Sequence, residues 1–169
     1  MVTLEEIWNK DEKVLGCSRS DILSKLPRRL SHSILKWAEI SPHAPALVGN
    51  ATTLTYAALQ QAVTESIEFL KSKGVRPGDR VMLVAENGIA LMCLFVALSE
   101  MDAIAVVINA RLSERELGLI QEDCDPRVVV FTTDDSTDAQ AHGKRLGALA
   151  DQLSFAKVAT STEFEASPE

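Results

Sequence analysis

The chain lacks the sequence signatures of several common functional classes. It has no GxGxxG or GxxxxGKS/T loop, so it carries neither a dinucleotide-binding fingerprint nor a P-loop. It has no GxSxG motif, which argues against the nucleophile elbow of an α/β-hydrolase. It also lacks an excess of positive charge, because its formal net charge is −7. Nucleic acids and anionic membranes attract basic surfaces, so we expect neither as a partner.

Cysteine is sparse and shows no metal-ligand spacing. Cys17, Cys93 and Cys124 are single and far apart, so we expect neither a zinc site nor a disulfide framework. Unpaired thiols fit a reducing compartment, and we therefore expect a cytoplasmic location. The longest apolar run, Ile89 to Leu98, is about half the length that a membrane helix requires, so no membrane span is expected.

The titratable residues form no recognisable catalytic or metal-binding pattern. His32, His43 and His142 are far apart and are interpreted as surface or partly buried imidazoles. The acidic segment 134–138 lacks the spacing of an EF-hand loop, so we interpret it as a solvated loop. The sequence therefore assigns no catalytic residue and no metal ligand.

The segment GVRPGDRVMLVAENG, residues 74–88, predicts an entry into a sheet. Gly74 can end a helix in the left-handed conformation, and Pro77-Gly78 suits the centre of a type II turn. The apolar run from Val81 to Ala85 is typical of a strand covered on both faces. Asn87 is expected to cap the helix that follows.

Similar signals predict an α/β protein: a parallel sheet with flanking helices built from βα repeats, plus an N-terminal helix and a β-hairpin. Strands that alternate with helices of about ten residues favour parallel pairing through crossovers. The expected helices are Leu4–Leu15, Leu30–Ile40, Tyr56–Lys73, Ile89–Met101, Glu114–Asp123 and Ala139–Leu153. The expected strands are Ala46–Val48 and Thr53–Thr55 (a hairpin around Gly49-Asn50), Arg80–Ala85, Ala103–Ile108, Arg127–Thr132 and Phe155–Ala159.

The expected organisation has three parts. Residues 1–29 form a weakly helical N-terminal extension, and residues 161–169 form a polar tail. The main part comprises a helix and hairpin (30–55) and the α/β region (56–160). A lone hairpin is marginal in water, and the last predicted strand lacks the functional loop that usually follows. The sequence therefore predicts a piece of a larger protein.

Three segments in this order resemble the adenylate-forming superfamily of acyl-CoA synthetases, luciferases and adenylation domains. They are LTYAAL (54–59), GVRPGDRVMLVAENG (74–88) and FVALSEMDAIAVVINARLSERELGLIQEDCDPRVVVF (95–131). The matching positions are Thr55, Gly74, Gly78, Asp79, Arg80, Val81, Asn87, Ala103, Asn109, Arg111, Leu112, Glu116 and Leu117. The likeness covers roughly residues 30–132, and the order of the segments is more specific than any one of them.

Three positions depart from the family's pattern. Asp102 stands where the family has a Gly, and Val107 and Ala110 stand where it has Pro. Asp102 is expected to remove a flexible hinge between helix and strand. The form NARLSERELG looks like acyl- or aryl-CoA ligases rather than peptide-synthetase adenylation domains.

The resemblance implies a partial N-terminal domain of an ATP-dependent, AMP-forming acyl-CoA ligase. In that reaction a carboxylate attacks the α-phosphate of ATP, and the CoA thiol then displaces AMP from the acyl-adenylate. The full-length enzyme would use ATP, Mg²⁺ and CoA on a small carboxylic acid. The family's catalytic motifs lie downstream, so none of these cofactors is expected in this chain, which alone is expected to be inactive. Its main expected partner is the C-terminal remainder of the enzyme.

Arg111 is the one candidate site residue, because it follows a strand at the edge where α/β sheets bind ligands. In some ligases that this segment resembles, the matching Arg lies near the nucleotide phosphate of CoA. The alternative is a loop Arg that pairs with Glu114 or is simply solvated.

Two other functions remain open at this stage. The chain could be a stand-alone binding or interaction module derived from the same fold. An unrelated Rossmann-like nucleotide binder is disfavoured by the missing glycine loop. The unpartnered hairpin and the apolar helix at Ile89–Leu98 also predict self-association of the isolated chain.

Overall fold

The computed structural model describes residues 3–49 and 52–161. The helices are α1 (Leu4–Leu15), α2 (Arg19–Lys25), α3 (Leu30–Ile40), α4 (Tyr56–Ser72), α5 (Ile89–Glu100), α6 (Glu114–Cys124) and α7 (Thr137–Arg145). The strands are β1 (Pro45–Val48), β2 (Thr53–Thr55), β3 (Arg80–Ala85), β4 (Ile104–Asn109), β5 (Val128–Thr132), β6 (Leu149–Gln152) and β7 (Lys157–Ser161). The predicted polar tail lies outside the described residues, apart from Ser161 at the end of β7.

A mostly parallel sheet of five strands organises the molecule, in the order β4-β3-β5-β7-β6. Strand β3 pairs in parallel with both β4 and β5, so that Ala85 lies beside Asn109 and Val84 beside Phe131. The carboxyl ends of these three strands therefore share one edge of the sheet. This confirms the α/β fold class and places the predicted ligand edge.

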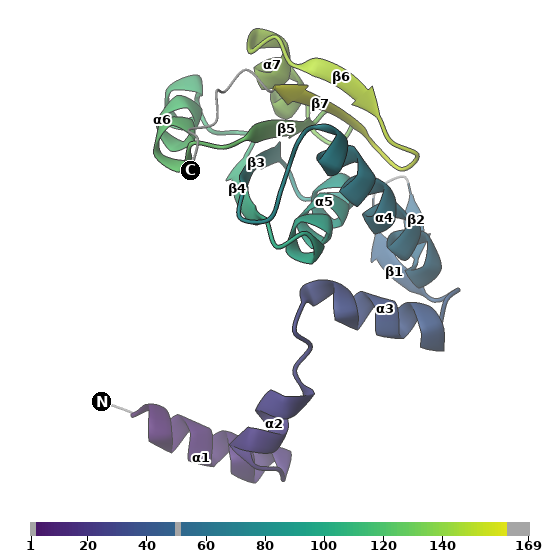
Figure 1. Ribbon diagram of the computed structural model, residues 1–169, viewed down its shortest axis with the longest axis vertical. Helices are drawn as coiled ribbons and strands as arrows, with labels where there is room; N and C mark the ends of the chain where they lie inside the picture. The colour runs from purple at the N-terminus through teal and green to yellow at the C-terminus, as the bar shows by residue number, and fades with distance from the viewer. Residues whose placement is uncertain (1–2, 50–51, 162–169) are drawn as a thin grey trace.

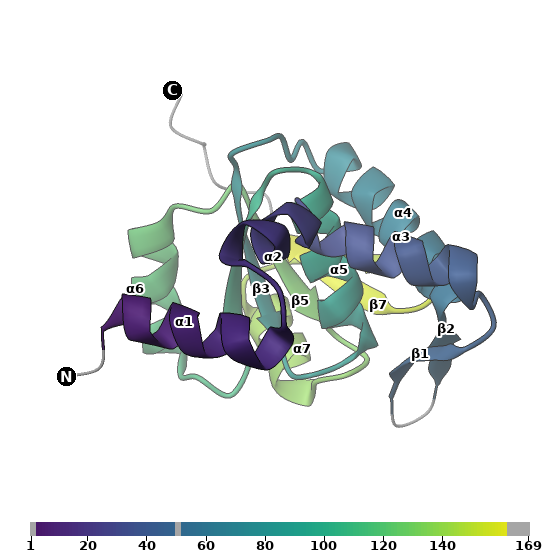
Figure 2. The ribbon, with the colours of Figure 1, turned by 90° about the horizontal axis from the view of Figure 1, so that it is seen from below.

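Helices cover both faces of the sheet (Figure 1). Helices α4 and α5 pack on one face, and α3 lies outside them, whereas α6 and α7 cover the other (Figure 2). Alternate residues of β3 and β5 point into the two cores, because side chains alternate along a strand. The largest fully buried side chains are Phe131, Leu70, Met82, Leu83, Leu94, Leu98, Val81, Val84, Val96, Val128, Val129 and Val130.

The turn that leads into β3 has the predicted geometry. Gly74 and Gly78 have φ of 82° and 85°, where a side chain would be strained. The backbone N–H of Asp79 donates to the carbonyl of Arg76 at 3.1 Å, which closes the turn. Thr55 caps α4, since its hydroxyl accepts from the N–H of Ala58 at 3.2 Å.

The predicted helix at Ala139–Leu153 is wrong in its second half. Helix α7 ends at Arg145, and Gly147 adopts φ of 66°, with the N–H of Ala148 donating to the carbonyl of Gly143 at 2.9 Å. This left-handed ending turns the chain back, so the next residues form β6 instead of a further helical turn.

The expectation of parallel pairing also fails at β6 and β7. The two strands pair antiparallel through a tight connection in which the N–H of Leu153 donates to the carbonyl of Ala156 at 2.8 Å. Such a short connection can join only antiparallel strands. The observed β7 starts two residues after the strand predicted at Phe155–Ala159 and pairs antiparallel with β5.

The predicted hairpin forms, but it does not join the five-stranded sheet. Strands β1 and β2 make a two-stranded antiparallel sheet of their own. Leu54 is buried and belongs to the core beneath α4 and α5, while Val48 is 78% exposed. Asn50 of the expected turn lies outside the described residues.

Helix α5 is buried, contrary to the expectation that it exposes an apolar surface. Seven of its twelve residues are buried between the sheet and helices α3 and α4. Because its environment is apolar on nearly every side, it needs no polar face. Among the described residues, no helix is long and apolar enough to cross a membrane.

Candidate functional site

The carboxyl edge of β3, β4 and β5 brings together one polar residue from each following loop. The Arg111 guanidinium contacts Glu86 through both of its carboxylate oxygens, at 2.9 Å from Nη2 and 3.3 Å from Nε. The hydroxyl of Ser136 donates to the same carboxylate at 3.4 Å. We call Glu86, Arg111 and Ser136 the edge cluster.

The partner of Arg111 differs from the one considered in the sequence. Glu114 pairs with Arg145 instead, at 3.0 Å, so the proposed Arg111–Glu114 pair is wrong. The parallel register explains the outcome, since Ala85 beside Asn109 brings the residues that follow β3 and β4 together. The order of elements could have suggested Glu86, because it directly follows the strand next to β4.

The ion pair shifts the pKa of both Glu86 and Arg111. The hydrogen bond from Arg111 lowers the pKa of Glu86, with a smaller contribution from Ser136. The same contact raises the pKa of Arg111. The Arg111 side chain is 70% exposed and that of Glu86 28%, so the guanidinium remains reachable from solvent.

The loop that carries Arg111 is held from both ends. The side-chain oxygen of Asn109 accepts from the N–H of Arg111 at 3.0 Å. From α7, Nε2 of His142 lies 3.1 Å from the carbonyl oxygens of both Ala110 and Leu112. A ring nitrogen beside carbonyl oxygens acts as the donor, so His142 carries its proton on Nε2.

His142 is buried, and its other ring nitrogen, Nδ1, contacts the guanidinium of Arg145. The sequence carries no signal for this brace, because nothing in the local pattern links α7 to the loop after β4. His142 therefore has a positioning role, because it orients the backbone of the loop that carries Arg111. His32 and His43 play no part in the edge cluster.

A cleft of about 530 Å³ lies between the hairpin, the start of α5 and the loop after β5. Among its lining residues, Asp135 lies against the first turn of α5, where its interaction with the N–H of Ala90 lowers its pKa. Burial raises the pKa of Asp135, and the neighbouring Asp134 adds to this shift. Asp135 thus supplies an acceptor to a helix end that has no side-chain cap of its own.

The predicted cap at Asn87 is wrong. Gly88 is the N-cap of α5 and makes no side-chain cap hydrogen bond. A Cβ atom on Gly88 would lie 2.3 Å from a carboxylate oxygen of Asp135. A side chain at this position would therefore push the exposed Asp135 carboxylate away from the start of α5.

The described residues hold no group of three His, Cys, Asp or Glu side chains that could bind a metal ion. Two of the three thiols are also poorly suited to chemistry in the folded chain. Burial raises the pKa of Cys93 to about 12 and also raises that of Cys124. The edge cluster can therefore bind an anion through Arg111, but it contains no thiol and no metal ligand set.

Comparisons with known proteins agree on one family. The model of the AMP-binding enzyme family matches residues 34–168. The chain is 33% identical over 96 residues to the long-chain-fatty-acid–CoA ligase FadD13 of Mycobacterium tuberculosis, covering 56% of the chain and 19% of that protein. It is 35% identical over 121 residues to a feruloyl-CoA synthase of Amycolatopsis, covering 70% of the chain and 25% of that protein.

The solved structures agree with the sequence relatives. The inhibitor-bound N-terminal domain of FACL13 from Mycobacterium tuberculosis aligns with a TM-score of 0.64 and 27% identity, over 74% of this chain and 31% of that one. The chain spans about a fifth to a quarter of the length of the two curated relatives. Since the family model matches most of the chain, including all five strands of the main sheet, the chain belongs to the AMP-binding enzyme family.

Proposed function

We propose that residues 30–160 are the N-terminal part of the AMP-binding domain of an ATP-dependent, AMP-forming acyl-CoA ligase. The family match over residues 34–168 carries this proposal. The named relatives support it, because they are CoA ligases of fatty and aromatic acids. The acid that this enzyme activates is a small carboxylic acid, which becomes an acyl-adenylate and then a CoA thioester.

In this proposal the sheet is a scaffold, and the groups that act on ATP lie beyond residue 169. The chain has no glycine-rich phosphate loop, and the described residues offer no Mg²⁺ site, so we assign no metal-dependent step to them. The remainder of the enzyme would cover the β1–β2 hairpin, since a two-stranded sheet is marginal alone. The three free cysteines favour the cytoplasm.

The coding sequence beyond Glu169 tests the proposal. We expect an open frame that continues into a Ser/Thr/Gly-rich loop ending in Lys, and a complete product that forms acyl-CoA from ATP, acid and CoA. A frame that stops at Glu169, or a longer product without acid-dependent pyrophosphate release, would contradict the proposal. Either result would favour a stand-alone binding module.

For Arg111 we propose a contact with the nucleotide phosphate of CoA. Its exposed planar guanidinium suits a phosphate, and its place at the carboxyl edge of the strands is where such folds bind ligands. Glu86 holds the guanidinium in place but also competes with the phosphate for it. Two substitutions with opposite expected effects follow from this competition.

In the complete enzyme, Arg111→Ala should raise the KM for CoA about tenfold or more, as expected for loss of a charge-assisted hydrogen bond. Glu86→Gln should leave the KM unchanged or lower it, because the competing charge is gone. Pyrophosphate exchange should stay near the wild-type rate in both variants. Arg115→Ala, on exposed α6, is the charge-matched control. Unchanged CoA dependence in Arg111→Ala would remove this residue from the site.

A further inference from the structure

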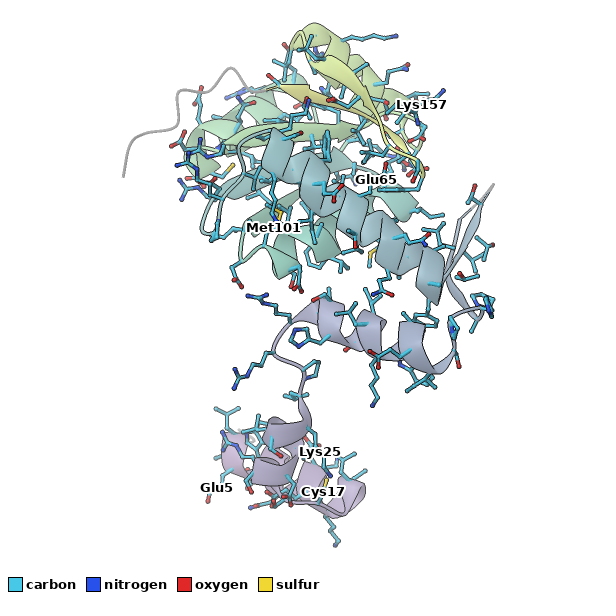
Figure 3. All side chains as sticks on the ribbon, turned by 45° about the vertical axis from the view of Figure 1, so that its right-hand side comes forward. Glu5, Cys17, Lys25, Glu65, Met101 and Lys157 are labelled. Atoms are coloured by element: carbon cyan, nitrogen blue, oxygen red, sulfur yellow. The ribbon has the colours of Figure 1, made fainter. Side chains whose placement is uncertain are left out.

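Helices α1 and α2 stand apart from the layers around the sheet. Figure 3 shows the labelled residues Glu5, Cys17 and Lys25 in this part, well separated from Glu65 and Met101. No residue of either helix is buried. We call residues 3–26 the N-terminal arm; it lies entirely outside the match to the family model, which begins at residue 34.

Local capping interactions nevertheless define where both helices begin and where α1 ends. Thr3 and Glu6 form a reciprocal capping box at the start of α1, and Ser18 and Asp21 form another at the start of α2. Gly16 ends α1 with φ of 65°. Helices of 12 and 7 residues are too short to be stable alone in water, so these caps indicate helices that pack on a partner.

Each helix has one apolar face that the structure leaves uncovered. Spacings of three and four residues place the apolar side chains of α1 along a single stripe, and the same holds for α2 and its C-cap. The α1 stripe consists of Leu4 (76% exposed), Ile7 (45%), Trp8, Val14 (75%) and Leu15 (59%). The α2 stripe consists of Ile22, Leu23 (49%) and Leu26 (58%).

Each stripe contains one charged residue, and the two residues have opposite charges. Asp11 lies at the centre of the α1 stripe by helical spacing, and Arg19 lies within that of α2. Both are exposed, and among the described residues neither forms a salt bridge. Arg19 instead lies over the ring of Trp8, at 4.5 Å from its centroid. The two apolar faces are therefore complementary in charge as well as in hydrophobicity.

We propose that the N-terminal arm is a self-association surface occupied by the arm of a second copy of this chain. Helix α1 of each copy packs on α2 of the other, with Asp11 opposite the second copy's Arg19. A two-fold axis repeats this ion pair, which fixes α1 against α2 rather than against the second α1. Helix α1 carries four carboxylates and two lysines, so two copies of α1 repel each other.

Charge reversal tests this arrangement by sedimentation velocity on the 169-residue chain. The wild type should show a concentration-dependent dimer. Asp11→Arg and Arg19→Asp should each weaken association about tenfold or more, because like charges then oppose each other. An equimolar mixture of the two variants should associate again, since one chain then carries cations at both positions and the other carboxylates. Lys13→Glu, on the polar face, changes the charge as much as Arg19→Asp and should have little effect.

Three results would overturn the proposal. They are a wild type that stays monomeric across the concentration range, reversals that leave association unchanged, and a mixture of variants that fails to associate. Retained association in a chain that begins at residue 27 would overturn it too, because another surface would then be responsible. All substituted residues are exposed, so the thermal unfolding of dilute samples should match the wild type and exclude misfolding.

Discussion

The N-terminal arm and the main part, which runs from α3 to β7, both contain many local folding signals. They differ in how far their helices and strands are buried. In the main part, strands β3 and β5 bury nearly all of their side chains, and α5 is enclosed by apolar neighbours. In the arm, two complete capping boxes define helices that bury nothing. Caps determine where a helix begins, whereas packing determines most of its stability.

One helix of the main part, α5, is capped differently from the two helices of the arm. In the arm, the capping residues lie three positions from each other in the chain. In the main part, α5 receives its acceptor from Asp135, which belongs to the loop after β5. A cap of this kind forms only once the sheet has assembled. The start of α5 is therefore coupled to the tertiary fold, whereas the helices of the arm, like α4, α6 and α7, are capped by residues close in sequence.

Thiol reactivity should show the largest difference between the two regions. Cys17, between α1 and α2, is partly exposed, whereas Cys93 in α5 is fully buried. Burial raises the pKa of Cys93 to about 12, so its thiol reacts only when the helix opens. In dilute native protein, an aromatic disulfide reagent should modify Cys17 about 10³-fold faster than Cys93 or more. Similar modification rates for the two thiols would contradict a main part that shields Cys93 from solvent.

Core truncation should separate the regions by stability. Leu94→Ala removes a fully buried side chain and should cost about 2–5 kcal/mol of unfolding free energy. The matched change Leu4→Ala, at a residue 76% exposed, should cost under about 0.5 kcal/mol in dilute protein. Urea unfolding followed by circular dichroism measures both. Equal losses would mean that the arm is packed on the main part.

The cap supplied by Asp135 makes a prediction at Gly88. Gly88→Ala should destabilise the chain by about 1 kcal/mol, because the new Cβ would push the Asp135 carboxylate away and remove this acceptor from the first turn of α5. Gly118→Ala is the control, since it lies in helix α6 with open space around it and should stabilise by up to about 1 kcal/mol. If Gly88→Ala proves neutral, or if Asp135→Ala does not relieve its cost, the close contact is not what constrains this position.

The smallest effect on stability is expected at Asp102, a position where the pattern of the adenylate-forming superfamily has glycine. Asp102 has φ of 56°, which strains a residue with a Cβ, while its carboxylate pairs with Arg29 at 2.5 Å. Asp102→Gly should relieve the strain and lose a largely exposed ion pair, for a net stabilisation below about 1 kcal/mol. Asp102→Ala loses the pair and keeps the strain, so it should destabilise. A glycine variant less stable than the alanine variant would contradict this account.

The sequence predicted the regions in which local and tertiary preferences coincide. Strand β3 was expected from an unbroken apolar run and found with the expected bounds, because a central strand needs no polar side chains. Strand β6 was missed because its residues, three of the four with good helix propensity, form an edge strand only through pairing with β7. Single-chain periodicity contains no information about such a partner.

The same limit applies to the candidate site. Arg111 could be placed at the sheet edge because a strand precedes it, and the structure confirms that position. Its contact with Glu86 depends on which strands are neighbours, and the brace from His142 depends on which loop α7 contacts. These are tertiary properties, which the sequence pattern of one segment does not contain.

Pyrophosphate exchange into ATP by the 169-residue chain alone tests the central claim most directly. If these residues are a scaffold whose catalytic groups lie elsewhere, the chain should show no acid-dependent exchange with fatty or aryl acids above a heat-treated sample. Calorimetry should likewise detect no ATP·Mg²⁺ binding tighter than about millimolar. The complete ligase should exchange under the same conditions. Acid-dependent exchange by residues 1–169 would contradict the account and show that this part of the fold contains an adenylating site of its own.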